Sequence, residues 1–108
     1  MTLETGSSPV VKHATEQDLR DAFKDDEGRG EFIILSQRPE VYMQAGGEDE
    51  PFNLEYRDGD VERHYRAEGV FRKDDVERAF VWYLTGDSRW MSEFRWKKID
   101  LKSWWKFW

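Results

Sequence analysis

The chain has 108 residues, no cysteine and a net charge of −6 at neutral pH. This length indicates one domain. The lack of cysteine excludes disulfides and thiolate metal sites and fits a reducing compartment. No apolar run approaches the roughly 18 residues of a membrane span, and the first residues lack the basic-then-apolar layout of a secretion signal. We therefore expect a cytoplasmic protein that does not insert into membranes.

The charge is unevenly distributed along the chain. Residues 1–88 contain 11 basic and 21 acidic side chains, whereas residues 89–108 contain 6 and 2. An acidic surface repels phosphates over long range, which argues against nucleic-acid binding, and it favours encounter with a basic partner. A second interpretation stays open, in which the acidity only keeps a small domain soluble.

The N-terminal part divides into a polar segment and a short helix. Residues 1–13 contain Gly6-Ser7-Ser8-Pro9 and are expected to form a tail or an edge segment, followed by a single domain over 14–108. A helix is predicted over about 16–26, with Thr15 as its N-cap and Asp18 at the third helical position.

Two strands with a turn after them are predicted next. The continuous apolar run within 31–36 suits a central strand buried on both faces. Alternation of apolar and polar residues predicts a second strand over 41–45. The sequence GGEDEP at 46–51 is then a turn.

A hairpin follows this turn. Alternation over 52–57 gives the cleanest strand pattern in the chain, and Asp58-Gly59 is a favoured pair for a tight turn. A fourth strand is expected over 61–71, with a bulge or bend at Gly69. A two-residue loop would place Tyr56 opposite Val61, whereas a loop one residue longer would shift this register, and the sequence leaves both open.

The strongest pattern is an amphipathic helix that begins near residue 73. Asp74 is predicted as its N-cap, with Glu77 completing a capping box, and Gly86 as the left-handed C-terminal cap. One face of this helix carries an apolar stripe at helical spacing, formed by Val76, Ala79, Phe80, Tyr83 and Leu84.

The C-terminal part is rich in aromatic residues. Alternation from Trp90 to Trp96 predicts a last strand. The ending IDLKSWWKFW either extends that strand or forms a short amphipathic helix with Asp100 as its N-cap, and the helix is favoured. The whole pattern predicts an α+β domain with a mostly antiparallel sheet of about five strands and two helices on one face, in the order α-β-β-β-β-α-β plus a short C-terminal aromatic segment.

No arrangement of residues typical of catalysis is found. His64 lies on the predicted outer face of a strand near Glu62, where a His–carboxylate pair could act in acid–base chemistry or metal binding, but a surface position is favoured. The serines lack a nucleophile elbow, and the glycines do not form a phosphate-binding loop. We therefore expect a protein that is not an enzyme and uses no metal or cofactor.

Three features indicate contact surfaces instead. Val81 and Trp82 lie off the apolar stripe, so they are either a hot spot for a partner or covered by the C-terminal segment. The acidic loop Glu48-Asp49-Glu50 would present carboxylates to a basic partner, unless it is a plain solvated turn. The third feature is an aromatic set near the C-terminus, made of Trp104, Trp105 and Trp108. We expect this set to pack onto the domain or to form a homodimer interface.

The stretch 73–96 also resembles a known family. The helix start Asp74-Asp75-Val76 with Ala79, then Leu84-Thr85-Gly86 and an aromatic strand ending in Trp96, is similar to the C-terminal part of small immunity proteins of bacterial polymorphic-toxin and contact-dependent inhibition systems. The resemblance implies a non-enzymatic cytoplasmic protein that binds and neutralises one cognate toxin, with contact residues specific to that partner.

The expected function is therefore protein binding, and the most specific hypothesis for the partner is a basic toxin domain. The alternative is a small-ligand-binding or enzymatic domain with an aromatic-lined pocket. That pocket would combine Trp90, Trp96 or Tyr65 with His64 and a carboxylate.

Overall fold

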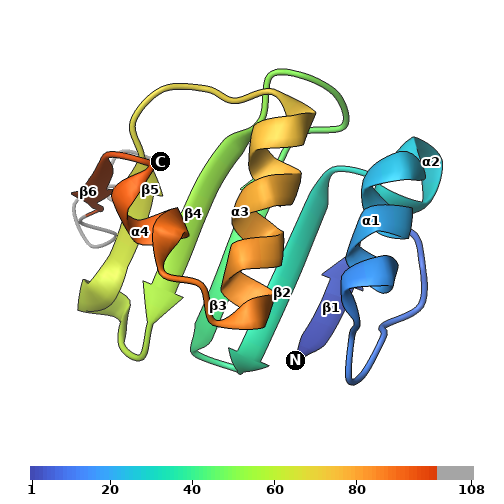
Figure 1. Cartoon of the computed structure of the whole chain (residues 1–108), viewed down its shortest axis with the longest axis horizontal. Helices are drawn as coiled ribbons and strands as arrows, with labels where there is room; N and C mark the ends of the chain where they lie inside the picture. Colours follow the sequence, from blue (N-terminus) through green and yellow to red (C-terminus); the bar gives the residue numbers. More distant parts are fainter. Residues whose placement is uncertain (100–108) are drawn as a thin grey trace, which may run out of the picture.

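The computed structural model describes residues 1–99 and contains one six-stranded antiparallel sheet whose strands lie side by side in sequence order (Figure 1). The strands are β1 (Thr2–Thr5), β2 (Phe32–Arg38), β3 (Val41–Gly46), β4 (Asn53–Asp58), β5 (His64–Ala67) and β6 (Trp96–Lys98). The helices are α1 (Glu16–Lys24), α2 (Asp26–Arg29), α3 (Lys73–Thr85) and α4 (Arg89–Ser92), and a single 3₁₀ turn, η1, spans Val61–Arg63. The predicted α+β class with a mostly antiparallel sheet is confirmed.

The strand that exceeds the expected five is β1, at the N-terminus. Of the two alternatives for residues 1–13, the structure has the edge segment, because β1 pairs with β2 with Leu3 opposite Leu35. On its other side Leu3 exchanges two backbone hydrogen bonds with Val11, so the segment after β1 folds back along this edge. This return covers part of an otherwise unpaired sheet edge.

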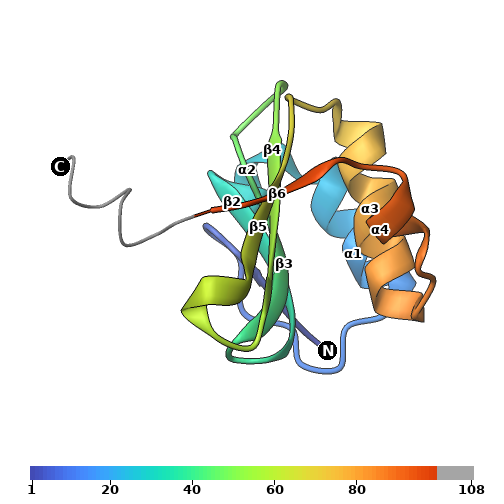
Figure 2. The same ribbon diagram turned by 90° about the vertical axis from the view of Figure 1, so that its left-hand side faces the viewer.

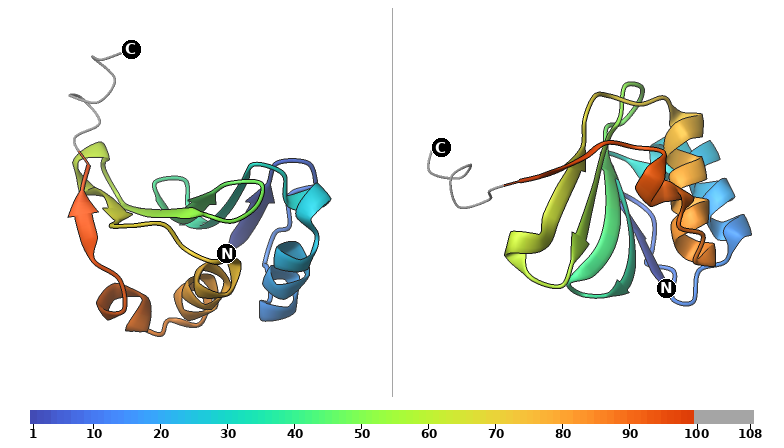
Figure 3. Two further views of the ribbon diagram at one scale, coloured as in Figure 1. Left: turned by 90° about the horizontal axis from the view of Figure 1, so that it is seen from above. Right: turned by 60° about the vertical axis from the view of Figure 1, so that its left-hand side comes forward.

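The helices occupy only one face of the sheet. Figures 2 and 3 show α1, α3 and α4 in a row on one side, while no helix of the described residues covers the opposite side. Such one-sided cover is common for antiparallel sheets, whose second face can be solvated. We call this second face the open face, and its outward side chains are Thr2, Glu4, Phe32, Ile34, Ser36, Arg38, Tyr42, Gln44, Asn53, Glu55, Arg57, His64, Arg66 and Lys97.

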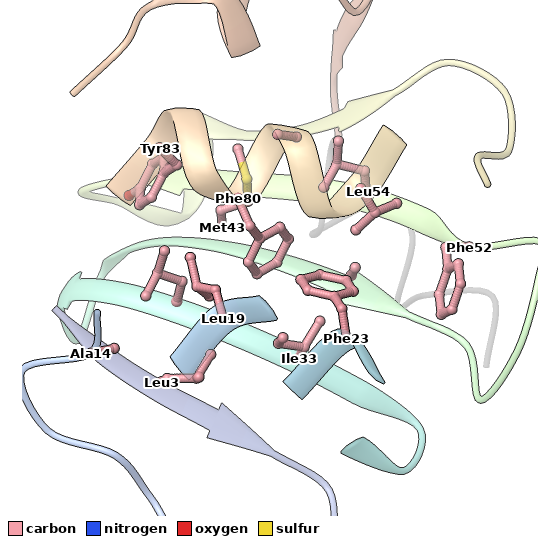
Figure 4. Packing of buried hydrophobic residues seen from close by; sticks show 14 of the residues in the cluster. Leu3, Ala14, Leu19, Phe23, Ile33, Met43, Phe52, Leu54, Phe80 and Tyr83 are labelled. Atoms are coloured by element: carbon pink, nitrogen blue, oxygen red, sulfur yellow. The ribbon is translucent and has the colours of Figure 1, made fainter. Parts of the chain in front are cut away.

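The core lies between the sheet and the helices (Figure 4). Phe80 of α3 and Phe23 of α1 are fully buried and meet edge to face, with ring centroids 5.5 Å apart. The predicted stripe of α3 is confirmed as the buried face for Val76, Ala79, Phe80 and Tyr83, while Leu84 is only partly buried at its margin. The inward residues of the sheet complete this core, among them Leu3, Ile33, Leu35, Met43, Ala45 and Leu54.

Of the helix caps predicted within residues 1–99, two are confirmed and one is wrong. Thr15 and Asp18 form a capping box at α1, which ends at Lys24 rather than 26. Gly86 takes the left-handed conformation after α3. Asp74 does not cap α3, because the helix begins one residue earlier, at Lys73, after an N-cap residue that makes no side-chain bond.

The expectation that the strand at 31–36 is buried on both faces is wrong. Its residues alternate between buried and accessible, and Phe32 is 39% exposed. The physical reason is the one-sided helix cover, which leaves the outward side chains of β2 on the open face.

The predicted strand from Trp90 to Trp96 is also wrong for most of its length. Residues Arg89–Ser92 form α4, and only Trp96–Lys98 pair with β5. The ring of Trp90 packs on the helix side of the sheet against Tyr56, Tyr83 and Trp96. Trp96 also donates its indole N–H to the carbonyl of Trp90 at 3.1 Å, so a turn between the two rings is what brings them together.

The β4–β5 hairpin has a longer loop than either alternative considered, because its innermost pair is Arg57 opposite His64 and residues 58–63 lie between them. Tyr56 lies opposite Tyr65 rather than Val61, and the two rings stack at 4.8 Å. The fourth strand is predicted over 61–71, but the observed strand β5 spans only His64–Ala67, and the 3₁₀ turn η1 contains the residues before it. Gly69 has φ 97° and makes the expected bend. The predicted helix through 101–108 lies outside the described residues.

Candidate binding surface at the acidic end

A buried arginine organises one end of the molecule. Arg29, at the end of α2, is only 1% exposed, and its guanidinium lies over the rings of Phe23 and Phe52 at 5.9 and 5.4 Å. It donates to the carbonyl oxygens of Ala22 at 3.3 Å and Phe23 at 3.0 Å. These are carbonyls of the last turn of α1, which lack partners within a helix, so Arg29 caps α1 from outside.

The same guanidinium connects α2 to the loop between β3 and β4. Its Nη2 donates to Asp26 Oδ1 at 2.7 Å and to the backbone carbonyl of Glu48 at 3.2 Å. The hydrogen bond from Arg29, followed by the charge of Lys73, holds the pKa of Asp26 below its usual value. Asp26 therefore stays ionised over the neutral range.

The predicted acidic loop is held at a second point. Glu50 Oε1 accepts the backbone N–H of Lys73 at 2.8 Å, and this bond occupies one of the donors that the first turn of α3 leaves free. Glu50 thus does the capping that the sequence assigned to Asp74. The side chain of Lys73 reaches Asp26 at 3.5 Å, so loop, α2 and α3 are joined at this end (Figure 1).

These contacts bring acidic residues from two segments around one hollow. We call it the acidic groove, and it is lined by Ser7, Asp26, Glu27, Gly30, Glu48 and Asp49. In the described part of the chain no ion pair engages Glu27, Glu48 or Asp49, and all three are exposed. Two of the predicted contact residues, Glu48 and Asp49, therefore lie together with two further carboxylates that were not singled out.

Val81 and Trp82, the predicted contact residues of α3, are both half-buried. Val81 is half-buried and packs against the core. Trp82 is half-buried under two arginines, Arg78 and Arg89, whose guanidinium carbons lie 5.6 and 5.1 Å from its ring. Such cation–π contacts attract a guanidinium to the ring face through the electrostatic field of the ring. The other predicted contact residues, Trp104, Trp105 and Trp108, lie outside the described residues.

His64 is on the open face as predicted, but it is not a surface residue. It is 5% exposed, and its Nε2 lies 2.9 Å from Glu55 Oε1, so its partner is Glu55 rather than Glu62. The ring of Tyr42 packs edge-on against it at 6.1 Å. Burial by itself would raise the pKa of Glu55, but the hydrogen bond with His64 and the charge of His64 outweigh it, so the pKa is lowered.

This shift predicts a pH dependence of stability. Because the pKa of Glu55 is lower in the folded chain, its contribution is present above the usual value of 4.5 and is lost as pH falls through the folded value. We expect Glu55→Gln to lower the free energy of unfolding by about 1 kcal/mol at neutral pH and to make the acid decline shallower. Urea titrations between neutral pH and pH 3 would measure this, with Glu62→Gln in the exposed turn as control. Equal acid slopes in all three proteins would contradict it.

The aromatic cluster and His64 do not share a pocket. Trp90, Trp96 and Tyr65 gather around Tyr56 on the helix side of the sheet, whereas His64 faces the opposite side. Within residues 1–99 no group of three or more His, Cys, Asp or Glu side chains could hold a metal ion. No helix in the same range is long and apolar enough to cross a bilayer.

No family model, curated protein or solved structure matches this chain.

Proposed function

We propose that this protein is a non-enzymatic protein-binding domain whose acidic groove binds a basic surface of a partner protein. The observation that carries the proposal is the buried Arg29, which fixes Asp26 and the Glu48 backbone to one another. A loop backbone held in place before binding loses little conformational freedom when a partner arrives. The negative field of the groove carboxylates also steers a basic partner towards them and raises the association rate.

The resemblance of residues 73–96 to immunity proteins gives the sharpest version of this proposal. In that version the partner is a cognate toxin domain, and the protein acts by covering it. A net charge of −6 supports recognition of a basic toxin such as one that acts on nucleic acid. The same version places the complex in the bacterial cytoplasm, where a toxin of this kind would be neutralised.

The test is affinity capture from the native lysate with matched charge-reversal variants. We expect the wild-type chain to retain one basic protein in stoichiometric amount, and Glu48→Lys/Asp49→Lys to retain it at least about tenfold less well, since charges at an interface act in concert. The control is Glu40→Lys/Glu62→Lys, which makes the same charge change at exposed positions near the other end of β3. Equal loss in both variants would show that only net charge matters, and would contradict a role for the groove.

A further inference from the structure

The open face differs in charge from the rest of the molecule. Its outward positions carry four cationic side chains (Arg38, Arg57, Arg66 and Lys97) and two carboxylates (Glu4 and Glu55), although the whole chain has a net charge of −6. One of the two carboxylates, Glu55, is already engaged with His64. The molecule thus has a cationic open face and, on other residues, an acidic groove formed by loops and α2.

The cations are concentrated on the last three strands. Arg66 lies between Glu55 and Lys97 in one row across the sheet, and Arg57 lies beside His64 in the next row. Arg66 and Lys97 are exposed, and Arg57 is half-buried. Spacing between neighbouring strands is about 4.8 Å, so these side chains can contact carboxylates presented by one partner surface.

The centre of the open face is held rigidly. Glu55 is bonded to His64 through one oxygen and accepts a hydrogen bond from Gln44 at 3.5 Å through the other. Tyr42 packs against His64 and also lines a shallow hollow over β1–β3 with Ser36 and Ile34. Tyrosine and arginine are the residues most often found at the energetic centres of interfaces, and rotamers fixed in advance lower the entropy cost of binding.

We propose that the open face is a second binding surface, which takes an acidic protein surface through Arg57, Arg66 and Lys97. This goes beyond the proposed function, because it concerns another face and a partner of opposite charge. A nucleic acid would also offer anionic groups. However, it extends beyond the face and would meet the field of an acidic chain, so an acidic protein surface of limited extent fits better.

The experiment is an NMR titration of the isotope-labelled full chain with an oligoglutamate peptide and, separately, with oligothymidylate. We expect oligoglutamate to shift backbone amide signals of β4–β6. We also expect Arg66→Gln/Lys97→Gln to bind it about tenfold more weakly. Lys12→Gln/Lys24→Gln removes the same charge from exposed positions outside the open face and should change the affinity less than about twofold.

Four outcomes would overturn the proposal. They are no binding of oligoglutamate, shifts confined to other elements, equal weakening in the two variants, and tighter binding of oligothymidylate than of oligoglutamate on the same strands. The last outcome would assign the face to nucleic acid. Both variants replace exposed side chains, so we expect the amide spectrum of each variant before titration to match that of the wild-type chain. Such a match shows that the variant is folded. Failure here leaves the acidic groove unaffected, because the groove is tested with other residues and a basic partner.

Discussion

Replacing Arg29 by methionine is expected to lower the free energy of unfolding by about 3 kcal/mol. Methionine can fill much of the space of the arginine stem but cannot donate hydrogen bonds. Three backbone carbonyls, those of Ala22, Phe23 and Glu48, would then lose their bond from the guanidinium. A buried acceptor left without a partner costs about 1–3 kcal/mol, and the carbonyl of Phe23 is such an acceptor. Together with the two part-buried bonds, this loss exceeds the stabilisation gained by burying an apolar side chain.

This result would distinguish Arg29 from an ordinary buried ion pair. Many such pairs can be replaced by apolar residues at no cost, because both charged partners are removed together. Here most partners are backbone groups, which no substitution removes. Urea unfolding followed by tryptophan fluorescence would measure the change. Arg20→Met serves as control, because Arg20 pairs with Glu16 at 3.2 Å on the exposed face of α1, and it should cost less than about 0.5 kcal/mol. Similar costs for the two variants would contradict the role of Arg29.

Local patterns in the sequence were sufficient for much of the fold. The stripe of α3 and its glycine cap, the capping box of α1 and the alternation of β3 and β4 each involve residues within a few positions of one another. The physical signals there are helical spacing, capping chemistry and the two-residue period of a strand. Nothing distant has to be known for these elements, and they are the ones that the structure confirms.

The candidate site depended on contacts that local patterns do not contain. Arg29 stands in the sequence DDEGRGE, which reads as a solvated loop, and its burial follows from acceptors on α1 and on a loop 19 residues further along. The burial of His64 depends on Glu55 and Tyr42, which lie on neighbouring strands and not in the sequence around residue 64. In the same way, the alternation at Trp90–Trp96 is compatible with a strand until Tyr56 and Tyr83 are known to lie beneath the ring of Trp90.

The largest effect of a single core substitution is expected at Phe80. Replacing it by alanine should lower the free energy of unfolding by about 3–5 kcal/mol, because the side chain is completely buried and its removal leaves a cavity between α3, α1 and the sheet. Domains of this size are stable by only about 5–15 kcal/mol, so this loss is a large fraction of the total stability. Phe32→Ala is the matched control on the open face, where 39% exposure predicts a cost below about 1 kcal/mol.

The pair of Phe80 with Phe23 makes this prediction more specific. If the two rings hold α1 against α3, the loss in Phe23→Leu/Phe80→Leu, whose smaller truncations keep the domain folded, should differ from the sum of the single leucine losses by about 0.5–1.5 kcal/mol, the range typical of an aromatic pair. Urea titrations of the four proteins with a common slope would measure this coupling. Additive losses would mean that each ring packs independently against the sheet. In that case the contact between the two helices would contribute no stability of its own.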